Sequence, residues 1–157
     1  MLNRRQIVAC SAALAVSAAS ADPAAPSGDG VVSAKSAYKF AETLDRIKAD
    51  IAGKKIMVFD AIDQAKLASD AGIQLRPSTL LLFGNPPLGV QFLTSNPAAG
   101  LDWPVRLLVT EDAEGQVWVH YTEWSRISQK YHIGDRDEAF SKAKMVVESI
   151  VASVAST

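Results

Sequence analysis

Three side chains in the sequence have the chemistry of an acid–base catalyst. The imidazole of His132 could act as a general base. Arg76 could bind a carboxylate or phosphate through two parallel hydrogen bonds, and Arg76 or Tyr121 could hold an anionic intermediate. His132 and Arg76 also have a purely structural interpretation. His132 can hydrogen-bond to a backbone carbonyl at a turn, and Arg76 can form a surface ion pair. The pattern therefore leaves a small hydrolase or isomerase open as an alternative.

The other titratable residues form no metal or dyad motif. His120 and His132 are twelve residues apart, and Cys10 is the only cysteine. Zinc needs three or four ligands, so we predict no metal and no cofactor. His120 is expected to pack across strands or to lie at the surface. Glu111 and Asp112 would point to opposite faces of a strand, so we expect a solvated turn in which Asp112 accepts from its own backbone.

The stretch "GNPPLG" at 84–89 could be a binding loop or a tight connection. Its two prolines, Pro86 and Pro87, remove N–H donors that an anion cradle requires. Gly84 and Asn85 tolerate backbone conformations that most residues avoid. We therefore predict a rigid turn that borders an apolar cavity between sheet and helices. The candidate ligand-binding residues are Phe83, Asn85, Tyr121 and His132.

Hydrophobic spacing predicts the elements that position these residues. "STLLLFG" at 78–84 does not alternate, which predicts a short strand covered on both faces. Helical stripes run through 40–51 and 140–154, and Ser36 is the expected N-cap of the first helix. The other expected strands are 31–37, 55–62, 105–112 and 116–124. The first should lie at an edge of the sheet, and the last two should form a hairpin.

This order of elements is strand–helix–strands–helix. Such an order is typical of an α+β fold. We expect an antiparallel sheet of four to five strands with two long helices packed on one face.

The N-terminal residues have the layout of a secretory signal. Arg4 and Arg5 precede an apolar run that ends at the small residues of 19–21. The run is too short for a membrane-spanning helix, so we expect no stable membrane insertion after cleavage and a periplasmic or secreted protein. The expected organisation is a signal peptide at 1–21, a flexible tether at 22–30 and one α+β domain at 31–157.

Composition excludes two classes of partner. Loss of Arg4 and Arg5 leaves 14 basic and 17 acidic residues, a formal charge of −3 with histidine neutral. Such a balance does not favour nucleic acid or an anionic membrane surface. Removal of Cys10 with the signal leaves no thiol for a disulfide or a nucleophile.

Three segments resemble the family called domain of unknown function 302. These are "LRPSTLLLFGNPPLG", "LDWPVRLLVTEDAEGQVWVHY" and "KYHIG". The resemblance runs from the first long helix to His132, and it implies a fold similar to the TATA-binding protein and self-association as homodimers, but no established activity. The sequence departs from the family pattern at Pro87, Leu88, Thr110 and His120. The positions that match it are Arg76, Pro77, Phe83, Gly84, Asn85, Pro86, Glu111, Asp112, Tyr121 and His132.

The sequence therefore predicts an exported, non-enzymatic binding module. Its ligand would be a small apolar or amphipathic molecule or a protein partner, bound in the cleft between sheet and helices. The alternative is the small hydrolase or isomerase in which His132 is the general base, with Arg76 or Tyr121 as partners.

Overall fold

A computed structural model describes residues 29–156, which form an antiparallel five-stranded sheet and five α-helices. The predicted signal peptide and most of the predicted tether lie outside these residues. The strand order is β1-β5-β4-β3-β2, and every neighbouring pair is antiparallel. The predicted α+β class and antiparallel sheet are confirmed. The strands are β1 (Val31–Lys35), β2 (Met57–Asp63), β3 (Ser78–Gly84), β4 (Val105–Glu111) and β5 (Val117–Thr122).

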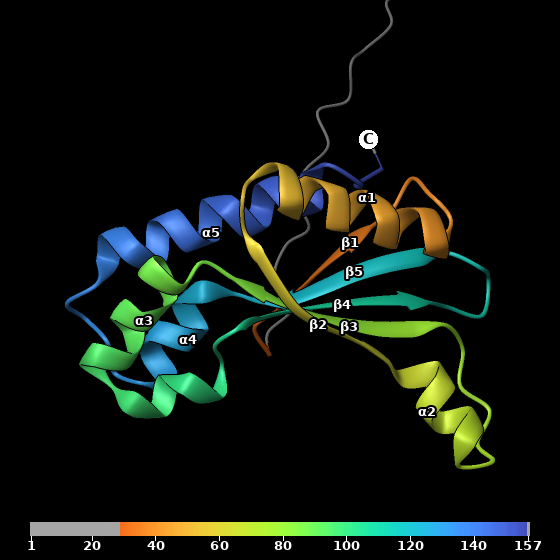
Figure 1. Cartoon of the computed structure of the whole chain (residues 1–157), viewed down its shortest axis with the longest axis horizontal. Coiled ribbons are helices and arrows are strands. Elements are labelled where there is room, and N and C mark those ends of the chain that lie inside the picture. The colour runs from red at the N-terminus through yellow and green to blue at the C-terminus, as the bar shows by residue number, and fades with distance from the viewer. Residues whose placement is uncertain (1–28, 157) are drawn as a thin grey trace, which may run out of the picture.

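The helices lie between and after the strands. Figure 1 shows α1 and α5 side by side over one face of the sheet, with α3 and α4 near one end of the molecule and α2 at the other. They are α1 (Phe40–Gly53), α2 (Gln64–Asp70), α3 (Pro86–Ser95), α4 (Trp124–Lys130) and α5 (Asp137–Ala152), with a 3₁₀ helix, η1, at Pro97–Leu101.

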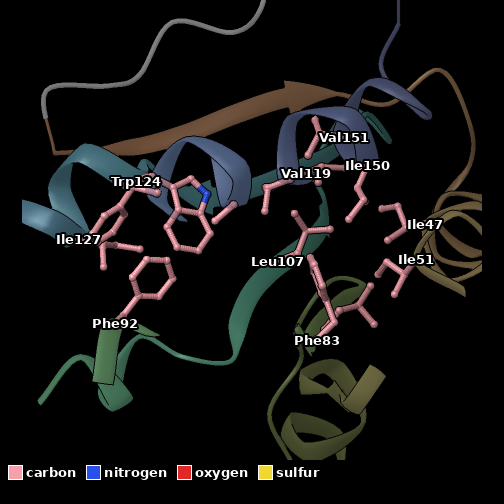
Figure 2. Packing of buried hydrophobic residues seen from close by; sticks show 14 of the residues in the cluster. Ile47, Ile51, Phe83, Phe92, Leu107, Val119, Trp124, Ile127, Ile150 and Val151 are labelled. Atoms are coloured by element: carbon pink, nitrogen blue, oxygen red, sulfur yellow. The ribbon is translucent and has the colours of Figure 1, made fainter. Parts of the chain in front are cut away.

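The core fills the space between the sheet and the α1–α5 layer. Ile47 and Ile51 of α1 and Ile150 of α5 are completely buried, as their helical spacing predicts. They face the inward side chains of the central strands, Leu107 and Val119 among them, which are also completely buried. Figure 2 shows Ile47, Ile51 and Phe83 at one end of this core, and Phe92, Trp124 and Ile127 at the other. Burial of such side chains, about 1.5–3 kcal/mol each, holds the two layers together.

Strand β3 is covered less evenly than its sequence predicts. Leu81 and Phe83 are 0% and 1% exposed, and they face the helices. Leu80 and Leu82 alternate with them on the opposite face and are only half-buried. The apolar run correctly predicts a strand inside the sheet, but the layer formed by α1 and α5 covers only one side of it.

Ser36 does not cap α1, which begins at Phe40. The Ser36 hydroxyl instead hydrogen-bonds to the Thr43 hydroxyl at 2.7 Å and accepts from the backbone N–H of Tyr38 at 3.1 Å. Ser36 and Thr43 are both buried. The pair thus fastens the end of β1 to the first turn of the helix.

The end of the chain is joined to its first strand. Ser36 and Ala155 form an antiparallel bridge. The Ala37 N–H donates to the Val154 carbonyl at 2.9 Å, and the Ser156 N–H donates to the Lys35 carbonyl at 2.9 Å. Residues 154–156 thus hold the outer strand β1 in place, in addition to its pairing with β5.

Candidate ligand-binding cleft

An apolar cleft of about 590 Å³ lies where the end of β3, helix α3 and helix α5 meet. Its volume is within the range of about 300–1,000 Å³ that small-molecule sites occupy. Aliphatic and aromatic side chains predominate in its lining, and polar ones are few. Its lining residues are Lys54, Ile56, Phe83, Gly84, Asn85, Pro87, Leu88, Gly89, Gln91, Phe92, Trp103, Val105, Trp124, Lys142, Ala143, Met145, Val146, Val147 and Ser149.

Packed rings make one wall of the cleft rigid. Phe92 and Trp124 are 3% and 5% exposed, and their ring centroids are 5.8 Å apart. Phe140 lies behind them, 4.4 Å from Phe92 and 6.1 Å from Trp124 between centroids. Such aromatic contacts contribute beyond the area that they bury. The wall is therefore formed by the core itself and is present without a ligand.

Trp103 forms a second wall because two glycines leave room for its indole. A Cβ atom built on Gly89 of α3 would overlap the indole, and one built on Gly84 would lie 3.3 Å from its Nε1 atom. The edge of Phe59 contacts the same ring, with centroids 5.8 Å apart and planes at 71°. The glycines of "GNPPLG" thus admit an aromatic side chain rather than a phosphate. The loop itself is a tight connection, since only Asn85 separates β3 from α3.

The charged residues that line the cleft are two lysines, and no carboxylate of the described residues lines it. Lys54 follows α1 and Lys142 lies on α5, and the remaining polar side chains are uncharged. Each lysine pairs with a carboxylate one turn earlier, Asp50 at 2.5 Å and Glu138 at 2.6 Å. The bond from Lys142 holds the pKa of Glu138 below its usual value. Neither carboxylate belongs to the lining of the cleft.

The structure separates the residues that the sequence predicts as ligand contacts. Phe83 and Asn85 line the cleft, whereas Tyr121 and His132 do not. Tyr121 lies half-buried on β5, where burial and then the charges of Glu148 and Glu123 raise its pKa to about 12. His132 is exposed after α4, with a left-handed backbone (φ 51°), and its N–H donates to the Gln129 carbonyl at 3.2 Å.

Arg76 and His132 are not brought together. Arg76 lies in the α2–β3 connection and His132 in the α4–α5 connection, and these segments are at opposite ends of the molecule (Figure 1). Arg76 acts electrostatically on Asp112, whose pKa is lowered mainly by a hydrogen bond from Trp118. Asp112 also accepts from the backbone N–H groups of Gln116 and Glu114, as predicted for the hairpin turn.

His120 packs across strands, as one of its two predicted positions requires, but its two hydroxyl partners were not predicted. Its Nδ1 atom lies 2.8 Å from the Ser33 hydroxyl, and its Nε2 atom lies 2.9 Å from the Thr110 hydroxyl. Burial lowers its pKa. The three side chains come from β1, β5 and β4, so no local pattern could reveal their meeting. They link adjacent strands, and none of them lines the cleft.

Among residues 29–156, no group of three or more histidine, cysteine, aspartate or glutamate residues is arranged to hold a metal ion. Within the same residues, no helix has both the length and the apolar character to cross a membrane.

Residues 32–150 match the family described as domain of unknown function DUF302. The chain belongs to the DUF302 family. A solved DUF302 protein from Bacillus stearothermophilus has the same fold, with a TM-score of 0.72 over 80% of this chain and 98% of that chain. The two are 13% identical, so this likeness concerns the fold alone.

Curated relatives of this DUF302 chain are longer proteins. One is "Fluoride-specific ion channel FluC 1" of Brucella suis biovar 1 (strain 1330), 32% identical over 114 residues, which cover 73% of this chain and 45% of that protein. Proteins of the same kind from Brucella abortus biovar 1 (strain 9-941) and Brucella melitensis biotype 1 (strain 16M) match at 32% over 42% of their length. The DUF302 chain thus spans less than half of these relatives.

Proposed function

We propose that this DUF302 protein is an exported binding module that holds a small apolar or amphipathic molecule in the α3–α5 cleft. The observation that carries the proposal is the cleft itself, about 590 Å³ between walls of packed aromatic rings. A ligand that buries about 150 Å² of apolar surface would gain about 4 kcal/mol, against which the costs of association count. Because the walls belong to the core, little of that gain would be lost in ordering the protein.

The alternative, a hydrolase or isomerase with His132 as general base and Arg76 as its partner, finds no support in the arrangement of these residues. A base must lie within about 3 Å of the proton it removes, or reach it through one water. His132 is exposed and lies at the opposite end of the molecule from the segment that carries Arg76. Binding is therefore the function that the geometry favours.

Filling the cleft tests the proposal. Val146 lines the cleft and is half-buried, whereas Val90 on the neighbouring helix α3 is 45% exposed and outside the lining. We expect Val146→Phe to weaken binding of the neutral dye Nile red at least fivefold, and Val90→Phe to leave it unchanged. Fluorescence titration measures both, and circular dichroism checks folding. Equal affinities in the wild type and both folded variants, or no binding to the wild type, would contradict the proposal.

Export and self-association are part of the same proposal. Export rests on the charge and apolar pattern at 1–21, and homodimer formation rests on the resemblance to the family. Native mass spectrometry of protein purified from the periplasm reports both, since it gives the mass of the mature chain and of the assembly. Retention of the first 21 residues would contradict export, and a monomer at micromolar concentration would contradict the dimer.

A second candidate function follows from the names of the curated relatives. Since a related segment occurs within proteins named fluoride-specific ion channels, this chain could act beside such a channel as a separate polypeptide. Deletion of the gene would then lower the growth-inhibiting fluoride concentration, and the tagged protein would co-purify with a channel of that kind. Unchanged fluoride tolerance together with no co-purification would exclude this role.

A further inference from the structure

We infer that the molecule bound in the cleft is a free single-chain amphiphile with an anionic headgroup, such as an alkyl carboxylate. This inference rests on the proposed binding function and specifies the chemistry of its ligand. It is based on the distribution of charge in the cleft: two lysines, no carboxylate and an aromatic wall.

The two lysines come from different elements and leave their side chains accessible to a ligand. The Lys54 side chain is 29% exposed and the Lys142 side chain 58% exposed. Lys54 follows α1 and Lys142 lies in the second turn of α5. An anionic headgroup at the cleft could therefore meet ammonium groups from both helices, which lie side by side in Figure 1.

The present partners of the lysines do not prevent this. The Glu138–Lys142 pair on α5 is exposed, and such pairs are weak. The pair of Asp50 with Lys54, at the end of α1, is partly buried but leaves the Lys54 side chain partly exposed. Each ammonium group has three donors, so it can bond a ligand anion and keep its own carboxylate. A cationic headgroup would meet the two lysines without any lining carboxylate to pair with.

The aromatic wall of the cleft favours an apolar chain for the part of the ligand beyond its headgroup. Phe83, Phe92 and Trp124 line the cleft and are at most 5% exposed, and the one polar atom of these rings, the buried Trp124 Nε1, has no hydrogen-bond partner within the described part of the chain. A polar body placed against them would lose hydrogen bonds to water without replacing them. An alkyl chain loses none, and each methylene that it buries raises affinity roughly fourfold. The headgroup therefore lies by the lysines and the chain along the rings.

The test compares three headgroups on one chain length. Isothermal titration calorimetry of the mature full-length chain would use decanoate, decyl glucoside and decyltrimethylammonium, each below its micelle concentration. We expect decanoate to bind at least tenfold more tightly than decyltrimethylammonium. Octanoate, with two methylenes fewer, should bind roughly fifteenfold more weakly than decanoate, given about fourfold per methylene. Added salt should weaken decanoate binding because the lysines are partly exposed.

Matched variants assign the preference to the cleft lysines. Methionine keeps the apolar stem of lysine and removes its charge, so the pair Lys54→Met and Lys142→Met should weaken decanoate binding roughly threefold to tenfold. Lys144→Met is the control, because Lys144 lies on the same helix, pairs with Glu148 at 3.8 Å and does not line the cleft. It should leave decanoate binding unchanged.

The outcomes separate the two proposals. Equal binding of the three headgroups, or equal loss in the control and in the double variant, would overturn the inference and leave a cleft that binds apolar chains. Binding to phosphatidylglycerol vesicles without binding to monomeric decanoate would also overturn it, in favour of a lipid surface. Failure of all three amphiphiles and of Nile red to bind the folded protein would overturn the proposed function as well.

Discussion

The close approach of Trp103 to Gly89 predicts that a glycine-to-alanine substitution, which usually stabilises a helix, destabilises the protein at this position. Replacing a helical glycine by alanine ordinarily stabilises a helix by up to about 1 kcal/mol. At Gly89 the added methyl group would overlap the indole of Trp103. The indole also contacts the ring of Phe59, so a shift of the indole would disturb that contact.

The expected magnitude follows from these opposing effects. Overpacking typically costs 1–3 kcal/mol, and loss of an aromatic pair costs about 0.5–1.5 kcal/mol. After the helical gain is subtracted, Gly89→Ala should lower the free energy of unfolding by about 1–3 kcal/mol. Gly53 is the matched control, because it lies in the last turn of α1 with nothing within 4 Å of an added Cβ. Gly53→Ala should be neutral or stabilising.

Urea denaturation followed by circular dichroism measures both changes. A second background isolates the cause: in Trp103→Leu the overlap is reduced, so Gly89→Ala should there cost at least 1 kcal/mol less than in the wild type. If Gly89→Ala behaves like Gly53→Ala, or costs the same with and without the indole, then Trp103 does not pack against α3 as described and the second wall of the cleft is misplaced.

Two further predictions concern the pH dependence and the polar core. Because the pKa of Tyr121 is raised from 10.0 to about 12 in the folded protein, the folded state keeps its proton longer than the unfolded state. Stability should therefore fall as pH rises from 10.0 to about 12, and less so in Tyr121→Phe; identical pH profiles in urea denaturation would contradict the shift. Ser36→Ala should lower the free energy of unfolding by about 1–3 kcal/mol, because it removes the hydrogen bonds of the buried Ser36 hydroxyl to Thr43, Tyr38 and Val154. The exposed Ser156→Ala should change it by less than about 0.5 kcal/mol, and equal costs for the two would contradict the role of Ser36.

The spacing of apolar residues correctly predicted helices and strands. The spacing of Ile47 and Ile51 predicted the buried stripe of α1, and the apolar run at 78–84 predicted a strand inside the sheet. The sequence predicted that both faces of β3 are covered, because it does not show on which face of the sheet the helices pack. Ser36 was wrongly predicted as the N-cap of α1. Its bond to Thr43 depends on the path of the chain between β1 and α1, which the sequence does not show.

The cleft could be predicted only in part. Phe83 and Asn85 were predicted because they flank a turn that follows a buried strand. Phe92 was missed as a wall, and the meeting of Phe92, Trp103 and Trp124 at one cleft could not be predicted, since they approach from three separate segments. The glycines at 84, in β3, and 89, in α3, were an available signal, because a glycine inside a strand or a helix often marks the close approach of another group.

The attachment of β1 to residues 154–156 has a consequence for biogenesis. The outermost strand completes its backbone hydrogen bonding only after residues 154–156 have left the ribosome, although its pairing with β5 can form earlier. A nascent chain therefore emerges with its sheet incomplete along that side.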